Sequence, residues 1–210
     1  MGNAVRPSKK IKPPLPTIEQ LEKARRSFED YEPRDLFYRA ATELVDLALD
    51  RKISLTVVEA LAVLLQTWNA QYYRFRHSFD AAHFEAIEAV VNSNLDALKG
   101  YRSRHLLTLE VDEVDLLARL FADFESVLGP VGAAKALHLL APEFFPLWDR
   151  KIAESYGIVL GNAGENGSEY VRFMTIVFEQ ITNVVTEADI RGILKRIDEF
   201  NYCRFTKGWL

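Results

Sequence analysis

The chain has 210 residues, of which 49% are hydrophobic and 27% charged, and this composition predicts a soluble domain with a full hydrophobic core. The net charge of −4 argues against a surface devoted to nucleic acid, which usually leans basic, although a local patch matters more than the sum. The single cysteine, Cys203, excludes an intrachain disulfide and a cysteine-based zinc cluster, and the four histidines show no metal-ligand spacing. We therefore expect neither a metal nor another cofactor.

No segment of the sequence predicts a targeting signal or a membrane span. The longest apolar run, Ala60 to Leu65, is much too short to cross a bilayer, and no apolar stretch follows the charged residues near the N-terminus. A single thiol in a chain of this length suits a reducing compartment. We therefore expect a cytoplasmic protein without membrane contact, and its oligomeric state stays open.

Two regions differ in composition from the rest of the chain. Residues 1–16 contain basic side chains and four prolines, which predict a disordered tail, with a phosphate-contacting arm as the alternative. Residues 17–210 predict a single all-α domain. Within it, the glycine- and asparagine-rich loop at 157–167 is the candidate for a lobe boundary or a lid.

Apolar residues at helical spacing, bounded by caps and breakers, predict a compact multi-helix bundle of about eight or nine helices. The expected helices cover residues 17–30, 33–49, 54–75, 80–98, 112–127, 133–140, 147–156, 168–184 and 187–201. Thr17, Ser54 and Thr186 are the expected N-caps, and Gly100 is expected to stop the fourth helix. The third helix is expected at the centre of the bundle, because apolar residues surround its axis.

The stretch 128–158 carries the clearest functional signal. Gly129, Pro130, Val131 and Gly132 predict a tight turn between two helices. Backbone amides at the start of the second helix, together with its dipole, can hold a phosphate there. An ordinary helix–helix turn is the alternative.

Trp148 and Asp149 follow Pro146 at the start of a later predicted helix. A carboxylate in that place can cap the helix. It can also face a cleft, where it would act as a general base or stabilise developing positive charge. Both interpretations stay open from the sequence.

The order of these pieces resembles the helix-hairpin-helix DNA glycosylase superfamily over residues 54–158. That family has a Leu-Pro-Gly-Val-Gly hairpin that grips one DNA strand through backbone amides, and an essential aspartate heads a later helix. In this chain Leu128 to Gly132 and Ala136 match the hairpin, Asp149 matches the aspartate, and Glu59 to Gln71 resembles an earlier apolar helix. The hairpin's proline and glycine are in swapped order, and the spacing to Asp149 is shorter than in the family.

The resemblance implies an all-α scaffold with a helix-hairpin-helix-like element, DNA as partner and Asp149 as the catalytic residue. Trp148 would bind the base, and the DNA-phosphate contacts would be Gly129, Val131, Gly132 and Lys135. The family's Schiff-base lysine position falls on Ala134, with Lys135 one place later. The implied activity is therefore monofunctional base excision without a lyase step, or a non-catalytic relative of such enzymes.

The run Leu-His-Leu-Leu-Ala-Pro-Glu-Phe-Phe-Pro-Leu-Trp-Asp, which ends at Asp149, also resembles a motif of uncharacterised bacterial proteins. This second resemblance indicates no function.

Aromatic and basic residues interleave near the end of the third predicted helix. Trp68, Tyr72 and Phe75 share one helix face, whereas Tyr73 and Arg76 lie on another. Stacking surfaces beside cations suit an extruded base or a single strand, so Tyr73 and Arg76 are predicted substrate contacts. The alternative is the end of an amphipathic helix, with aromatic residues in the core and arginines in water.

The sequence leaves three functions open. The sequence has no P-loop, no Gly-x-Ser-x-Gly and no His-Glu-x-x-His. The first hypothesis is a DNA-binding protein of glycosylase-like fold. The alternative is a non-enzymatic helical module that binds a protein partner, and the third is an enzyme acting on a small molecule beside Trp148.

Overall fold

The computed structural model describes residues 15–184 and 191–210, and within these ranges the chain forms helices, turns and loops without a strand. The predicted all-α, multi-helix class is confirmed: these ranges hold nine α-helices, α1 to α9. No helix among the described residues has the length and apolarity needed to cross a membrane. The predicted cap Thr186 and nearly all of the predicted tail lie outside the described residues.

The first four helices are α1 (Ile18–Tyr31), α2 (Asp35–Leu49), α3 (Val57–Trp68) and α4 (Ala70–Phe75). Thr17 closes a capping box at the start of α1, as its sequence predicts. The third helix does not begin at Ser54, because the hydroxyl of Thr56 and the carboxylate of Glu59 form the capping box that starts it. It also ends at Asn69 instead of continuing, and α4 follows as a separate short helix.

The other helices are α5 (Ala81–Arg102), α6 (Val114–Leu140), α7 (Arg150–Ser155), α8 (Gly167–Val184) and α9 (Ile193–Asn201), followed by a C-terminal turn of π-helix (Tyr202–Lys207). Gly100 does not stop α5, contrary to its prediction. The helix continues to Arg102, whose Nη1 donates to the carbonyl oxygens of Leu139 and Leu140 at 3.0 and 2.7 Å. This tertiary anchor outweighs the weak helix propensity of one glycine.

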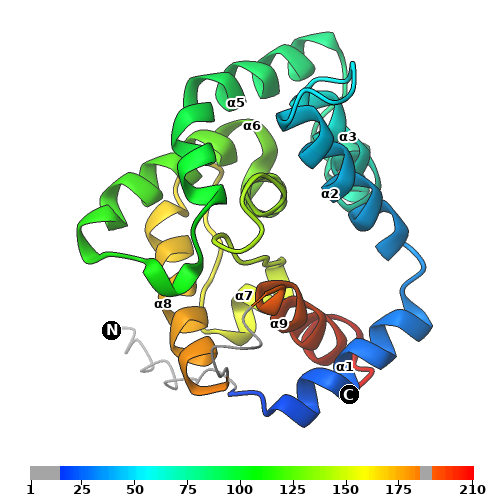
Figure 1. Ribbon diagram of the computed structural model, residues 1–210, viewed down its shortest axis with the longest axis vertical. Helices are drawn as coiled ribbons and strands as arrows, with labels where there is room; N and C mark the ends of the chain where they lie inside the picture. Colours follow the sequence, from blue (N-terminus) through cyan, green and yellow to red (C-terminus); the bar gives the residue numbers. More distant parts are fainter. Residues whose placement is uncertain (1–14, 185–190) are drawn as a thin grey trace, which may run out of the picture.

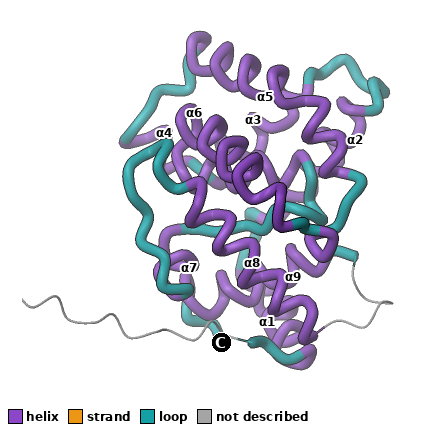
Figure 2. Tube along the Cα trace, turned by 90° about the vertical axis from the view of Figure 1, so that its left-hand side faces the viewer, coloured by secondary structure: helices purple, strands orange, loops and turns teal. Residues whose placement is uncertain are grey.

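Segments from the two ends of the described chain meet in space. α2 packs on α3, α5 on α6 and α6 on α8, whereas α1 packs on α9. Figures 1 and 2 both show α1 beside α9, at the end of the molecule away from α5. Residues of α1 and α9 can therefore contribute to one site.

α6 changes direction at Gly129, which takes a φ of 68° and a ψ of 169°. Pro130 follows, and proline suits the first turn of the second half because no amide is needed there. Figure 1 shows this second half almost end-on near the centre of the molecule. Its residues Ala133, Ala134 and Leu137 are each 0% exposed. This half of α6 is thus the helix at the centre, the place that the sequence predicted for α3, while the helix-hairpin-helix element stays a prediction.

The loop at 157–167 is fastened to α6. Glu125 is fully buried, and its carboxylate accepts hydrogen bonds from the backbone amide of Asn166 at 3.0 Å and from that residue's side chain. Burial raises the pKa of the Glu125 carboxyl. The role of this loop as a lid or lobe boundary stays a prediction.

The approach of α8 to α6 gives a test of the packing. A Cβ at Gly167 would lie 2.2 Å from the backbone oxygen of Ala118. Because a backbone atom cannot turn aside, Gly167→Ala should lower the free energy of unfolding by about 1–3 kcal/mol, measured by urea denaturation. Gly100→Ala is the control, since a Cβ there meets nothing within 4 Å and should be neutral or stabilise by up to about 1 kcal/mol. Equal stability of the two variants would contradict this packing.

Candidate functional site

A pocket of about 70 Å³ lies where α1, α6, α9 and the segment leading into α7 converge. A single water needs about 10–15 Å³ on this measure, so the pocket has room for a few waters or one small flat ring. Four aromatic side chains line it: Phe28, Trp68, Trp148 and Tyr202. Five charged ones also line it: Glu32, Arg34, Lys135, Asp149 and Asp198. Aromatic walls with a few convergent polar groups are typical of a small-molecule or base-binding site.

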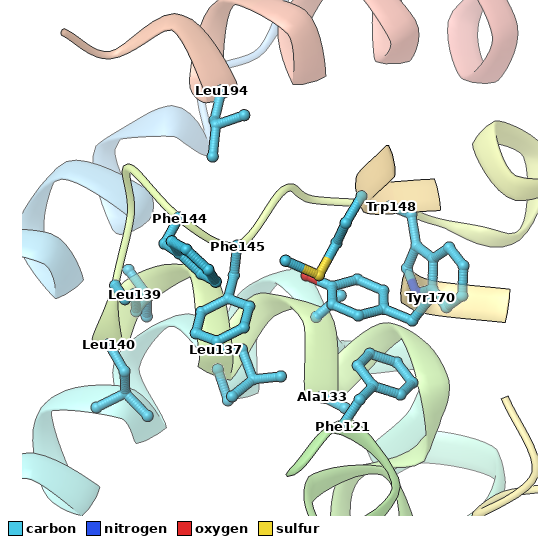
Figure 3. Close-up of a cluster of buried hydrophobic side chains, with 14 of the residues drawn as sticks. Phe121, Ala133, Leu137, Leu139, Leu140, Phe144, Phe145, Trp148, Tyr170 and Leu194 are labelled. Carbon is cyan, nitrogen blue, oxygen red and sulfur yellow. The ribbon is translucent and has the colours of Figure 1, made fainter. Parts of the chain in front are cut away.

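Trp148 forms a fixed wall of the pocket. It is 1% exposed, and its ring centroid lies 5.5 Å from that of Phe121 and 5.0 Å from that of Tyr170. Figure 3 shows Trp148 beside Tyr170 in this cluster. Its indole Nε1 donates to the Pro130 carbonyl oxygen at 3.0 Å, which ties the segment before α7 to the bend of α6. Trp148 lines the pocket, but only part of its ring can face a ligand. Its role as a base contact stays a prediction.

Asp149 is held by two donors. Its Oδ1 accepts from the backbone amide of Ile152 at 2.8 Å and so caps α7. Its Oδ2 accepts from the Thr206 hydroxyl at 2.7 Å. The carboxylate is half-buried and lines the pocket, so the helix cap and the site residue are the same group.

Lys135 belongs to the pocket and not to the outer surface. Its Nζ donates to the backbone oxygen of Trp68 at 2.5 Å. Burial lowers the pKa of this ammonium to about 8, although the carboxylates of Asp149 and Asp198 oppose the shift. A lysine with a pKa near neutrality exchanges its proton readily, a property of lysines that act as bases or nucleophiles. Lys135 lies in the pocket, and the phosphate contact that the sequence predicted for it stays a prediction.

Asp198 is a pocket residue that sequence reasoning missed. It lies on α9, is 8% exposed, and burial raises the pKa of its carboxyl to about 7. Leu194, Asp198 and Asn201 share the buried face of α9 at helical spacing. A carboxylate on an otherwise largely apolar helix face is the one sequence signal that could have drawn attention to it.

Glu32, Arg34 and Tyr202 form the rim of the pocket, and the sequence did not reveal them as site residues either. Arg34 donates to Glu32 through Nε at 2.7 Å and Nη2 at 2.6 Å, and the Tyr202 hydroxyl donates to the same carboxylate at 2.7 Å. The hydrogen bonds from Arg34 hold the pKa of the Glu32 carboxyl at about 2. The Arg34 side chain is 48% exposed and marks the side of the pocket that faces solvent.

Tyr73 and Arg76, the other predicted substrate contacts, do not line the pocket. The Tyr73 ring packs edge-on against Phe79, and its hydroxyl lies 3.3 Å from Nε2 of His83. Arg76 is exposed beyond the end of α4. The break at Asn69 is the reason, because it turns α4 away from the continuous helix that the prediction assumed.

The bend of α6 is covered rather than open. Gly129 and Gly132 are buried, and Val131 is half-buried. A Cβ at Gly129 would lie 3.0 Å from the Tyr72 ring, and one at Gly132 would lie 2.9 Å from Nδ2 of Asn69. These glycines therefore let the α3–α4 junction pack closely on α6. In this arrangement they offer no open surface to a phosphate, contrary to the role predicted for them.

An exposed basic patch lies beside the pocket instead. α7 and the C-terminal turn carry four exposed basic residues and one exposed acid, Glu154; the basic residues are Arg150, Lys151, Arg204 and Lys207. None of these four forms an ion pair with another described residue. α7 with its N-cap and the C-terminal turn also supply Asp149, Ile152 and Tyr202 to the pocket. We call these four residues the basic patch.

Arg102 and Arg104, at the end of α5 and in the link that follows it, differ from the basic patch. Arg102 is paired with Asp46, and Arg104 is paired with Glu113. These guanidinium groups are occupied within the protein, so the link offers less to an anionic ligand than the basic patch does.

Comparison of the chain with models of protein families, with curated proteins and with solved structures gives no match. In the described part of the chain, no group of three or more potential ligand side chains could hold a metal ion. The candidate site therefore rests on the geometry and chemistry of its own residues.

The raised pKa of Asp198 predicts a pH-dependent stability effect. The unfolded carboxyl ionises near pH 3.8, whereas the folded one does so near pH 7, so the wild-type chain loses stability as the pH rises between these values. Asp198→Asn removes this loss. It should stabilise the protein by about 2–4 kcal/mol more at pH 8 than at pH 4.5, measured by urea unfolding at both values. Asp96→Asn, on the exposed side of α5, should show no such difference, and a pH-independent effect at Asp198 would refute the assignment.

Proposed function

We propose that the chain binds DNA and takes one extruded nucleobase into the pocket, as a monofunctional base-excision enzyme of glycosylase-like scaffold. The observation that supports this most is the meeting of Lys135, Trp148 and Asp149 in one aromatic-walled pocket. Lys135 lies on α6, whereas Trp148 and Asp149 are consecutive in the segment that leads into α7. The resemblance noted in the sequence named all three. A flat base suits walls of this kind, because aromatic side chains stack on every base.

The chemistry requires few groups. Cleavage of the glycosidic bond develops positive charge on the sugar, and a fixed carboxylate such as that of Asp149 stabilises it. Water adds its oxygen to C1′ and one of its protons ends on the departing base, so no further reactant is needed. The donors from Ile152 and Thr206 hold the Asp149 carboxylate in one orientation, which is the pre-organisation that electrostatic catalysis depends on.

The basic patch would supply the phosphate contacts that the covered bend does not. Phosphate contacts by Lys and Arg dominate DNA affinity and position the duplex without reading its sequence. Four exposed cations beside the pocket suit this task despite a net charge of −4.

The buried charges favour a ligand site over the alternative of a purely protein-binding module. Lys135 and Asp198 each carry a pKa shifted toward neutrality by burial. Groups of this kind reduce stability and cluster at functional sites, whereas a docking surface does not require them.

DNA binding is testable through the basic patch. The wild-type chain should bind a duplex that contains an abasic-site analogue more tightly than a plain duplex, with an affinity that falls with salt. Arg150→Glu/Arg204→Glu should reduce the slope of log affinity against log salt by about 2, because two phosphate contacts are lost. The charge-matched control is Lys52→Glu/Lys99→Glu, which lies on the α2–α3 connection and α5 and should leave the slope unchanged. No binding at low salt, or an equal effect in both variants, would remove the proposal.

Catalysis is testable through Asp149. Duplexes that each carry uracil, hypoxanthine, 3-methyladenine or 8-oxoguanine would be assayed for release of the free base. Asp149→Asn should lower the rate on the accepted duplex by about 100-fold or more while DNA affinity is kept. Thr206→Val removes one donor that orients the carboxylate and should have a smaller effect of about tenfold. Equal rates in wild type and Asp149→Asn would exclude this residue from catalysis.

A further inference from the structure

The polar groups that line the pocket differ in how far the protein itself satisfies them. Both oxygens of the Glu32 carboxylate accept hydrogen bonds, from Arg34 and Tyr202. Both oxygens of Asp149 also accept, from Ile152 and Thr206. The oxygens of these two carboxylates therefore already have hydrogen-bond donors within the protein.

The N–H groups of the two indoles in the pocket also have partners within the protein. Trp68 Nε1 donates to the backbone oxygen of Arg34 at 2.9 Å, and Trp148 Nε1 donates to that of Pro130 at 3.0 Å. Their rings can contact a ligand, but their donors are occupied.

Asp198 stands apart from these groups. It lines the pocket and the residue is 8% exposed. Its carboxyl oxygens keep some accessible surface there and form no hydrogen bond or ion pair with another described residue. A buried polar group without a partner costs free energy, and most such groups in proteins have one. Its hydrogen-bonding capacity is thus directed into a small, aromatic-walled space.

We infer that Asp198 forms hydrogen bonds with the polar edge of a flat, ring-shaped ligand in the pocket. This edge carries a hydrogen-bond donor next to an acceptor. A protonated carboxyl has the complementary pair, an O–H donor beside a C=O acceptor, and can form two hydrogen bonds with such an edge. Lactam and amidine edges of this kind occur on every nucleobase. The inference deepens the proposed function and rests on it for the nucleobase, but the pocket chemistry itself needs no DNA.

The surroundings of Asp198 keep a proton on it near neutral pH. Burial raises its pKa to about 7; Lys195 and Lys135 oppose the shift, whereas Asp149 and Glu199 add to it. The charged and titratable groups around it come from several elements. They are Lys195 and Glu199 on α9, Lys135 on α6, Tyr38 on α2, Asp149 and Tyr156 at the two ends of α7, Glu32 and Arg34 between α1 and α2, and Tyr202 and Cys203 in the C-terminal turn. Above pH 7 the ionised carboxylate offers two acceptors, so it repels the acceptor of a mixed edge.

The probe is 2-pyridone, a single flat ring with an N–H donor next to a carbonyl acceptor. Its matched partner, 1-methyl-2-pyridone, lacks the donor. Affinities for the whole chain would be measured by ligand-observed NMR between pH 5.5 and 8.5, a range in which neither probe titrates. At pH 6 the wild type should bind 2-pyridone about tenfold more tightly than the methylated probe, the value of one net hydrogen bond. Its affinity should fall by up to about tenfold per pH unit above pH 7.

Two variants separate recognition from folding. Asp198→Asn keeps a donor beside an acceptor at every pH, so it should bind 2-pyridone equally at pH 6 and 8.5 and keep the preference over the methylated probe. Asp198→Leu should lose that preference. A wild type that does not bind 2-pyridone, or does not distinguish the two probes, overturns the inference. So does an Asp198→Asn variant that keeps the pH dependence of the wild type.

The outcome is separable from that of the proposed function. Probe recognition by Asp198 in a chain that binds no DNA would remove the DNA proposal and support the inference. Base release by a chain that fails the 2-pyridone test would support the DNA proposal and overturn the inference.

Discussion

At Gly129 the backbone adopts a positive φ of 68°, a conformation that side-chain-bearing residues rarely take, and the Tyr72 ring lies where a side chain would begin. The bend turns the second half of α6 into the centre of the molecule, so that Lys135 reaches the pocket. The carbonyl of Pro130, one residue further on, accepts the indole N–H of Trp148 and so fixes the segment that leads to Asp149. The bend thus brings the lysine, the tryptophan and the aspartate to one place.

The pocket formed in this way is not optimised for stability. A lysine and a carboxylic acid are buried with pKa values shifted toward neutrality, and the Asp198 carboxyl forms no hydrogen bond with another described residue. A well-packed apolar core would avoid both costs. Local departures from good packing and pairing are typical of functional sites.

Net charge is a poor guide to the surface beside this pocket. The chain carries −4 in total, yet α7 and the C-terminal turn together present four basic residues and one acid. Other basic residues, such as Arg102 and Arg104, are paired within the protein. The distribution of unpaired charge therefore matters more than its sum for recognition of an anionic partner.

Features set by neighbouring residues could be predicted from the sequence. The helical class, the capping box at Thr17 and the aspartate at the head of α7 depend on side chains within about one helical turn, and sequence patterns report such interactions well. Features set by packing could not. The cover over Gly129 and Gly132, the continuation of α5 past Gly100 and the contribution of Asp198 and Tyr202 all depend on segments distant in the chain. Only the tertiary structure brings α1 against α9 and closes the pocket, because burial and unpaired charge arise from contacts that no local pattern specifies.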